Sequence, residues 1–309
     1  MDLNDFKYKL NYYFNIPLKN FLYPNIQTGR LFNVEVSKRG SIISIVVSGY
    51  DRIIFKTLEN NFTKELTDQI INSVDQVLGK DQKLTVLRDT INLKFRYGMI
   101  NTLDITLYIC YGDVCPANFN SPILRSGIIP YFYLNGITYV ILGVKVYREG
   151  NVYSDFGGGC KTSKKELAYD CANREMFEES LGILTKGGTI THIFSTLTVG
   201  TGNLGNVRFN VHQMLYFIDY TKELFIDRLA LSNQSDVVLK STTSIIPGVD
   251  EYVLIDIRKK YHEIVKKYQN PELEDIFIMT YDTLKKLPNS LLGENLYDIY
   301  KLLPDNLIN

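Results

Sequence analysis

Alternating apolar and polar residues predict a β-sheet near the start of the chain. Residues 31–36 (LFNVEV) and 41–47 (SIISIVV) alternate over short runs, with the turn-forming residues 37–40 (SKRG) between them. Because successive side chains of a strand point to opposite faces, this pattern predicts two half-buried strands. The run TLDITLYICY, residues 102–111, predicts a further strand.

A four-residue spacing of apolar positions predicts one long helix from about residue 53 to residue 78, with Gly79 as its C-terminal cap. The apolar positions are Ile54, Leu58, Phe62, Leu66, Ile70, Val74 and Leu78. A second helix is predicted over residues 83–97. These helices and strands together predict a small α+β domain over residues 1–118.

The second part of the chain follows a predicted linker at residues 115–127, where two prolines stand among polar residues. Two apolar runs between Gly127 and Tyr147 meet at Asn135-Gly136, which predicts a β-hairpin. The other predicted elements are strands at 191–202 and 205–220, helices at 221–231, 252–268 and 294–303, and a strand running into a short helix at 276–287.

Charge and length limit the classes of function. The 309 residues favour two domains over one. Lys plus Arg and Asp plus Glu number 34 each; 14 basic and 12 acidic residues lie in the first 120, leaving 20 and 22 after them. Neither half is strongly basic, so no DNA partner is expected and a long RNA footprint is disfavoured.

Cysteine usage and hydropathy favour a cytoplasmic protein. The four cysteines contain no CxxC spacing and only three histidines are present, so no zinc site is predicted. Pro130 and Asn135-Gly136 interrupt the longest apolar stretch, so no membrane span is predicted. Residues 1–10 lack the apolar core of a signal peptide. We expect reduced thiols and no membrane partner, and the oligomeric state stays open.

Three glutamates gather on one turn of a predicted helix that runs from Lys165 to about Leu181. Glu175, Glu178 and Glu179 stand at i, i+3 and i+4, where like charges destabilise an isolated helix by roughly 0.2–0.5 kcal/mol per pair. A solvated acidic face is one interpretation. However, Glu175 and Glu179 share a stripe with small residues that are expected to pack on a sheet, namely Ala168, Cys171 and Ala172. Carboxylates aimed inward need cations, and oxygen ligands favour Mg²⁺ or Mn²⁺.

A glycine run, Gly157-Gly158-Gly159, precedes this helix. Glycine permits positive φ and a close approach of the backbone, which phosphate and metal sites often require. A plain turn explains three glycines equally well. Next to the acidic helix, the run predicts a glycine-lined bend that faces the carboxylates.

The segment resembles the Nudix box, whose pattern is G-x5-E-x7-R-E-U-x-E-E-x-G-U, where U is aliphatic. Glu166, seven residues, and then Arg174-Glu175-Met176-Phe177-Glu178-Glu179 match its central part. Two positions depart from it: Cys160 stands where the box glycine belongs, and Leu181 is interpreted as an insertion before Gly182. The resemblance implies an α/β/α sandwich with a mixed sheet over residues 119–309, with a helical insertion near 219–272.

The resemblance also implies roles for the box residues. Glu175 and Glu179 would be the principal metal ligands, with Glu178 as a further ligand or the base. Gly158 or Gly159 would offer a backbone carbonyl. Arg174 would orient the carboxylates by pairing with Glu166; the alternative is a surface ion pair with Asp170. The catalytic set is thus Glu166, Arg174, Glu178 and Glu179.

A general base outside the box is also implied, with Glu223 and Glu251 as candidates, although surface positions are the simpler interpretation of both. His192 and His212 lie in apolar strand contexts and are expected to be structural.

The resemblance implies hydrolysis of a pyrophosphate linkage in a nucleoside diphosphate joined to another group. A first domain and an insertion favour a large substrate, capped RNA, as in the decapping Nudix enzymes of large DNA viruses; a viral protein would then act in the host cytoplasm. Without Trp, the cap base would stack on Tyr or Phe. The alternatives are a pyrophosphatase for dinucleoside polyphosphates, nucleotide sugars or damaged nucleotides, and a non-catalytic module that binds a nucleotide or a partner protein.

Overall fold

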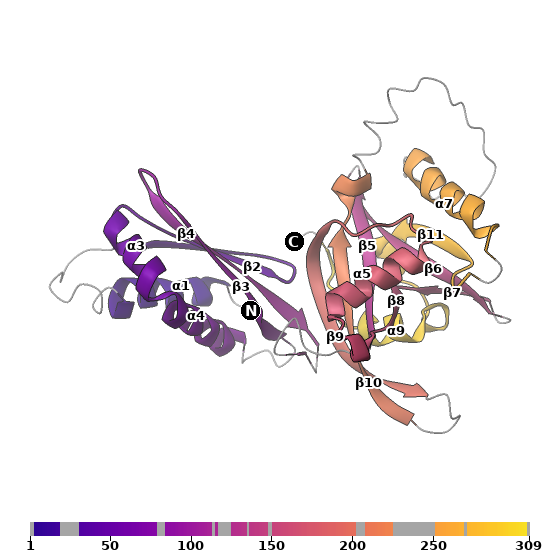
Figure 1. Ribbon diagram of the computed structural model, residues 1–309, viewed down its shortest axis with the longest axis horizontal. Coiled ribbons are helices and arrows are strands. Elements are labelled where there is room, and N and C mark those ends of the chain that lie inside the picture. The colour runs from indigo at the N-terminus through magenta and orange to yellow at the C-terminus, as the bar shows by residue number, and fades with distance from the viewer. Residues whose placement is uncertain are drawn as a thin grey trace, which may run out of the picture. The chain divides into compact units, whose positions relative to one another are not determined.

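A computed structural model describes the fold (Figure 1), and it divides into a first unit, residues 1–121, and a second unit, residues 122–307. The residues that the structure describes are 3–18, 31–78, 84–112, 115–116, 125–134, 136–147, 150–201, 208–224, 251–268 and 271–307. Among these residues, no helix combines the length and the apolar character needed to cross a membrane.

Four antiparallel strands form the sheet of the first unit, in the order β1, β2, β4, β3. Their bounds are β1 Asn33–Arg39, β2 Ile42–Gly49, β3 Leu84–Arg96 and β4 Asn101–Tyr111. Alternate residues of β2 and β4 are buried, so one face of the sheet points into the core. The strands predicted near residues 31–48 and 102–111 are confirmed.

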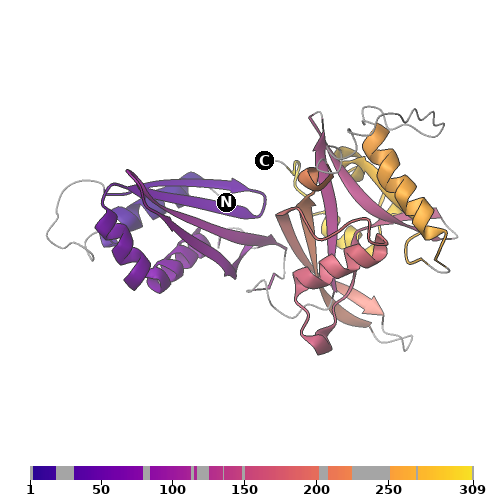
Figure 2. The same ribbon diagram turned by 45° about the horizontal axis from the view of Figure 1, so that its top comes forward.

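Helices cover that face of the first sheet, as the indigo and purple ribbons of Figure 2 show. Their bounds are α1 Leu3–Tyr13, which continues into a π-helical turn at Phe14–Leu18, α3 Arg52–Asn61 and α4 Thr63–Leu78. Apolar side chains of the three helices and of the sheet form one buried cluster.

The single helix predicted from residue 53 to residue 78 is wrong, because the chain breaks at Phe62 into α3 and α4. Each four-residue step advances about 40° around a helix, so the seven apolar positions would spread over about 240° of one straight helix. Two helices let both apolar faces meet the same core. The predicted cap, Gly79, lies outside the described residues.

The helix predicted over residues 83–97 is also wrong, because this segment is the edge strand β3. Core-facing residues are Leu84 and Val86 at one end but Ile91, Leu93 and Phe95 at the other, so the alternation changes phase. The change coincides with an irregularity in the β3–β4 register between Leu87 and Asn92. A bulge of this kind hides a strand from a simple period-two pattern.

The second unit contains a mixed sheet in the order β9, β10, β5, β6, β11. β5 and β10 run parallel and the other neighbours antiparallel, while β7 pairs with β6 and β8 pairs with β5. The bounds are β5 Arg125–Leu134, β6 Ile137–Tyr147, β7 Gly150–Ser154, β8 Phe156–Gly159, β9 Thr189–Thr201, β10 Arg208–Asp219 and β11 Asp275–Thr280.

Helices pack on both faces of this sheet. Tyr216 and Phe217 are neighbours in β10, so their side chains point to opposite faces. The Tyr216 ring contacts Tyr169 of α5 (Ala168–Glu179), with ring centroids 5.2 Å apart. The Phe217 ring contacts Tyr281 of α8 (Tyr281–Leu284), with ring centroids 6.4 Å apart. The second unit is therefore an α/β/α sandwich with a mixed sheet, which confirms the predicted fold class.

Two further helices complete the second unit: α7, Glu251–Val265, packs against β11, and α9, Glu294–Tyr300, packs against β9. The hairpin at 127–147, the two strands between residues 191 and 220 and these C-terminal elements confirm the predictions. The helix predicted at 221–231 is described only as far as residue 224. Its remainder and the polar segment 232–248 lie outside the described residues, so the insertion near 219–272 stays a prediction.

Candidate functional site

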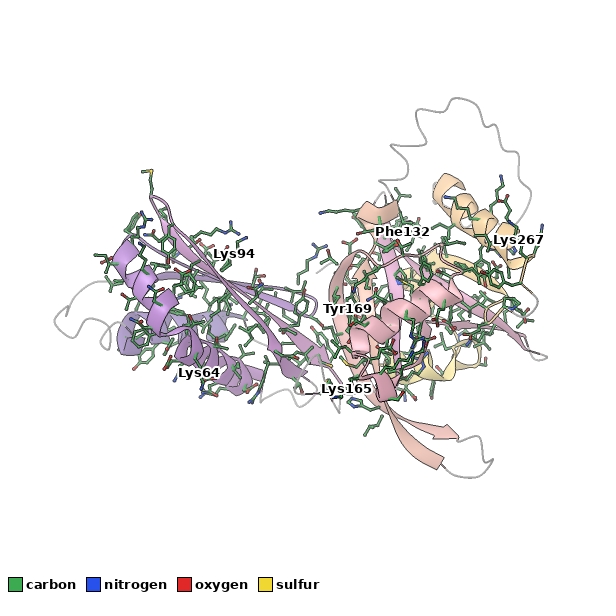
Figure 3. All side chains as sticks on the ribbon, in the orientation of Figure 1. Lys64, Lys94, Phe132, Lys165, Tyr169 and Lys267 are labelled. Carbon is green, nitrogen blue, oxygen red and sulfur yellow. The ribbon has the colours of Figure 1, made fainter. Side chains whose placement is uncertain are left out.

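The three glycines lie in strand β8, not in a bend. Gly157 and Gly158 pair with Gly127 and Ser126 of β5, and none of the three glycines has positive φ. A 3-10 turn follows, then Lys165 with φ +54° at the turn before α5 (Figure 3). The predicted helix start at Lys165 is therefore three residues early, because α5 begins at Ala168.

Close approach explains why β8 contains glycines. A Cβ added at Gly158 would lie 2.4–2.8 Å from the carboxylate atoms of Glu175. One added at Gly157 would lie 2.6 Å from the Cα of Gly127. At Gly159 an added Cβ would meet nothing within 4 Å. The first two glycines thus let α5 and β5 pack directly against β8, and the third does not serve this purpose.

Helix α5 turns two of the three glutamates toward β8. Glu175 is 8% exposed and Glu179 is 3% exposed, and they share the buried stripe with Ala168, Cys171 and Ala172, as the spacing predicts. The side chain of Glu178 remains 52% exposed. The solvated-face interpretation therefore fits Glu178 alone.

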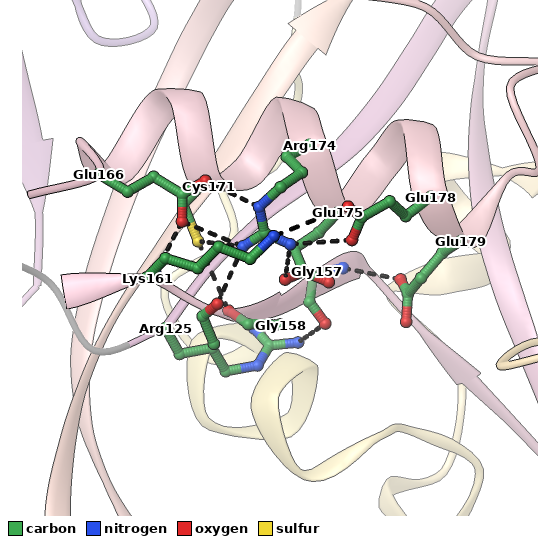
Figure 4. Close-up of polar contacts among 11 residues, drawn as sticks. Arg125, Gly157, Gly158, Lys161, Glu166, Cys171, Arg174, Glu175, Glu178 and Glu179 are labelled. Atoms are coloured by element: carbon green, nitrogen blue, oxygen red, sulfur yellow. Dashed lines mark hydrogen bonds and ion pairs between the residues drawn. The ribbon is translucent and has the colours of Figure 1, made fainter. Parts of the chain in front are cut away.

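Arg174 links four oxygen groups around this helix (Figure 4). Its Nε and Nη2 donate to the two carboxylate oxygens of Glu166 at 2.7 and 3.0 Å. Its Nη1 donates to Glu175 at 2.5 Å and to Glu178 at 2.9 Å, while Nη2 also donates to the Gly159 carbonyl at 3.0 Å. The guanidinium offsets the repulsion between the carboxylates and ties α5 to β8.

The expected Arg174–Glu166 pair is thus present, whereas the alternative partner, Asp170, lies 3.3 Å from Lys186 instead. The hydrogen bonds from Arg174, followed by the backbone N–H of Lys161, lower the pKa of Glu166 to about 2. Glu166 is therefore a charged anchor for Arg174 at any ordinary pH.

Glu179 is the least compensated carboxylate of the cluster. Its Oε2 accepts a hydrogen bond from the Gly157 N–H at 2.8 Å, and its Oε1 lies 3.6 Å from the Lys145 ammonium. Burial raises its pKa to about 8, and nearby Asp155 adds to that rise. Burial likewise raises the pKa of Glu175, although the contact with Arg174 opposes the rise.

A buried ion pair that the sequence pattern did not reveal holds β8 in place. Arg125 donates to both carboxylate oxygens of Asp155, at 2.9 and 3.1 Å, and to the Gly157 carbonyl at 3.2 Å. Gly127 makes room for the pair, because a Cβ there would lie 1.8 Å from an Asp155 oxygen. The predicted linker included Arg125, whereas this residue begins strand β5. The position of Asp155, two residues before the first glycine of the run, is a signal that the sequence does contain.

The end of α5 corrects the interpretation of Leu181 as an insertion. Leu181 has φ +55°, and its N–H donates to the Glu178 carbonyl at 3.1 Å. The N–H of Gly182 donates to the Phe177 carbonyl at 2.8 Å. This is the Schellman arrangement, in which the left-handed position is usually glycine. Leu181 therefore takes the place of the box glycine, as Cys160 does at the start of the segment.

The other candidate residues have different surroundings. Glu223 accepts a hydrogen bond from the Gly188 N–H at 2.6 Å, which is a structural contact. Glu251 begins α7, and its side chain is not described. His192 is buried and stacks on Phe194.

The Nε2 of His212 lies 2.7 Å from the Ser195 hydroxyl, so this ring also has a partner within the sheet. Glu272, which the sequence pattern did not single out, is an exposed carboxylate close enough to Glu175 to raise its pKa.

The donor set fits a hard divalent cation in part. Within the described chain, no three Asp, Glu, His or Cys side chains surround one point as a metal ion requires. Arg174 provides a reason, because it draws Glu175 and Glu178 toward its own guanidinium. Buried Glu179 has one ammonium, that of Lys145, at 3.6 Å, and the Gly158 carbonyl accepts a weak S–H donor from Cys171 at 3.7 Å. Glu175, Glu179 and this carbonyl form the oxygen set that Mg²⁺ or Mn²⁺ prefers.

Comparisons with known proteins add a weak likeness. No family model and no curated protein matches the sequence. Among solved structures, the chain is similar to the NUDIX domain of NrtR from Shewanella oneidensis, complexed with ADP ribose, at 10% identity and a TM-score of 0.30, covering 61% of this chain and 90% of that one. It is also similar to an Ap4A hydrolase from C. elegans at 17% identity and a TM-score of 0.24, covering 48% and 100%. Because these values are low, we argue the function from the residues of the site.

Glu179 should make the stability of the metal-free protein depend on pH. Its pKa is about 8 in the folded protein against an ordinary value of 4.5, so the folded protein retains a proton that the unfolded chain loses between these values. Stability therefore falls as pH rises from about 4.5 to about 8. With a chelator present, Glu179→Gln should be more stable than the wild type by about 4 kcal/mol at pH 8 and nearly equal to it at pH 4.5.

Urea unfolding at the two pH values checks this prediction. Exposed Glu263 of α7 provides the matched control, Glu263→Gln, which should show no such difference. A stability difference for Glu179→Gln that does not change with pH would contradict the assignment.

Proposed function

We propose that the second unit is a Nudix-type pyrophosphohydrolase that cleaves a nucleoside diphosphate from the group joined to it. One observation carries the proposal: Glu175 and Glu179, one helical turn apart, are both buried against the glycine strand β8. A helix that only covered a sheet would place apolar residues there, because burying carboxylates costs free energy. Two such residues beside the backbone of a glycine strand support a chemical use.

In this proposal Glu175, Glu179 and the Gly158 carbonyl hold the cation. When bound, Mg²⁺ or Mn²⁺ neutralises charge on the phosphoryl oxygens of the substrate and assists the attack of water. Arg174 is a positioning residue: held by Glu166, it fixes where Glu175 and Glu178 point. Lys145 and the Gly157 N–H orient Glu179.

The proton of the attacking water needs an acceptor with access to solvent. Glu178 keeps its expected role as a further ligand or this base, because it is half exposed and adjacent to the buried pair. Glu272 is the second candidate, since it is exposed and its charge acts on Glu175. Both carboxylates are exposed to solvent where they stand, so either can accept a proton from water.

Within this class we propose the 5′ cap of RNA as the substrate. Small nucleotides need little beyond a catalytic unit, whereas this chain adds a first unit with its own sheet and core. The first unit also exposes tyrosine rings on which a base could stack, namely Tyr8, Tyr12 and Tyr50, at 72%, 52% and 82% exposed. The alternative substrates are free dinucleoside polyphosphates, nucleotide sugars and damaged nucleotides.

Two neighbouring glycines provide a matched test of the site. Gly158→Ala should lower hydrolysis by about 10- to 100-fold, because its methyl group displaces the Glu175 carboxylate, and small displacements of catalytic groups cost rate steeply. Gly159→Ala adds the same methyl group where nothing lies within 4 Å and should retain the wild-type rate. Initial rates with Mg²⁺ or Mn²⁺ check this, and equal losses in both variants would argue against the proposed site.

Substrate choice needs a direct comparison. The wild-type chain is offered cap-labelled RNA beside a panel of free nucleotides, and the released products are identified. Release of m7GDP from RNA, with the free dinucleotides left intact, is the expected result, and the reverse pattern would assign a small-molecule pyrophosphatase. Glu179→Gln should abolish turnover; a protein that binds nucleotide but turns over none of them would instead be a non-catalytic module.

A further inference from the structure

Two cysteine thiols meet beside the glutamate cluster. Cys160 directly follows β8 and is partly exposed, whereas Cys171 lies in the first turn of α5 and is buried. Each thiol is the largest influence on the pKa of the other, lowering that of Cys160 and raising that of Cys171. Cys171 also donates to the Gly158 carbonyl at 3.7 Å and accepts from Arg174 Nη2 at 3.8 Å (Figure 4).

We propose that Cys160 and Cys171 are a modification site, at which hydrogen peroxide converts the two thiols into a reversible disulfide. The partly exposed Cys160 sulfur attacks the peroxide, taking one oxygen to become a sulfenic acid while the peroxide leaves as water. The Cys171 sulfur then attacks the Cys160 sulfur, an S–S bond forms, and the hydroxyl leaves as a second water. Two thiols are oxidised by two electrons and one peroxide is reduced; a dithiol reductant reverses the step by exchange.

The geometry favours this pair for chemical as well as spatial reasons. Oxidation needs one thiol that the oxidant can reach and a second thiol in contact with it that resolves the sulfenic acid. Cys160 meets the first condition and Cys171 the second. The short hydrogen-bonded loop between them, which includes the 3-10 turn Thr162–Lys164, links the two elements that carry the thiols.

The disulfide would change the site that the proposed function uses, and on this point the inference rests on that proposal. A disulfide brings two sulfurs to about 2.05 Å, well inside the distance at which two unbonded sulfur atoms touch. The end of β8 and the first turn of α5 must therefore move together, which alters the contacts of Cys171 with Gly158 and Arg174. Because β8 has no spare room against Glu175, the carboxylates move with it.

A second thiol pair offers a matched control. In the first unit, burial and then the neighbouring Cys115 thiol raise the pKa of Cys110, and Cys110 is buried while Cys115 is partly exposed. None of the described hydrogen bonds joins either of these two thiols to the glutamate cluster. The double variant Cys110→Ser/Cys115→Ser should therefore leave the proposed switch intact.

The experiment uses the full-length chain. The reduced protein is treated with hydrogen peroxide, free thiols are alkylated, and tryptic peptides are analysed by mass spectrometry. Peptides 149–161 and 166–174 each contain one cysteine of the pair, so their disulfide appears as a linked species. Cys110 and Cys115 share the peptide 97–125, so their disulfide leaves a single peptide. Mn²⁺ binding and hydrolysis are measured on the same samples before and after reduction with dithiothreitol.

We expect the linked species, a loss of Mn²⁺ binding and of hydrolysis on the order of 100-fold, and recovery of both after reduction. Cys160→Ser, Cys171→Ser and Cys171→Ala should each keep Mn²⁺ binding after peroxide, while the Cys110/Cys115 variant loses it. The absence of the linked species, or its formation without any loss of binding, overturns the proposal. If the reduced protein hydrolyses none of the substrates, the proposed function is wrong. The disulfide proposal is then still tested by the linked peptide and by the loss of Mn²⁺ binding after peroxide.

Discussion

The candidate site depends on one steric constraint, the absence of side chains at positions 157 and 158. Without a Cβ at Gly158, the Glu175 carboxylate occupies the space where that atom would lie. Without one at Gly157, β8 approaches β5 closely and presents its N–H to Glu179. Helix α5 can therefore lie directly on the strand, and its carboxylates become buried at a point where backbone groups of β8 are within reach. The burial of Glu175 and Glu179 follows from that contact.

Charge compensation then divides the carboxylates into two kinds. Arg174 donates hydrogen bonds to Glu166, Glu175 and Glu178. Because the pKa of Glu166 is low, this carboxylate stays charged and keeps its contact with Arg174. Glu179 receives one N–H and a more distant ammonium, and its pKa rises accordingly. A protein that keeps such a residue loses stability in the metal-free state, which is the pattern expected of a site that is completed by a cation.

Much of this was readable in the sequence, because spacing along a helix fixes which residues share a face. The stripe of Glu175 and Glu179 with Cys171, and the pair of Arg174 with Glu166, required only helical geometry and the box pattern. Long-range contacts and irregularities of helices and strands could not be predicted from the sequence. The phase change in β3 hid a strand, the break at Phe62 split a helix, and the strand pairing that brings Arg125 to Asp155 joins segments thirty residues apart. The glycines looked like a bend because period-two alternation is invisible in residues without side chains.

The central claim is that Glu175, Glu179 and the Gly158 carbonyl together hold a divalent ion. A crystal structure of the reduced protein soaked with Mn²⁺ tests it directly, through the anomalous scattering of manganese. We predict a peak within bonding distance of both carboxylates and of that carbonyl, with Arg174 released from Glu175. A map with no peak there at saturating Mn²⁺, and with the Arg174–Glu175 contact intact, would contradict the account.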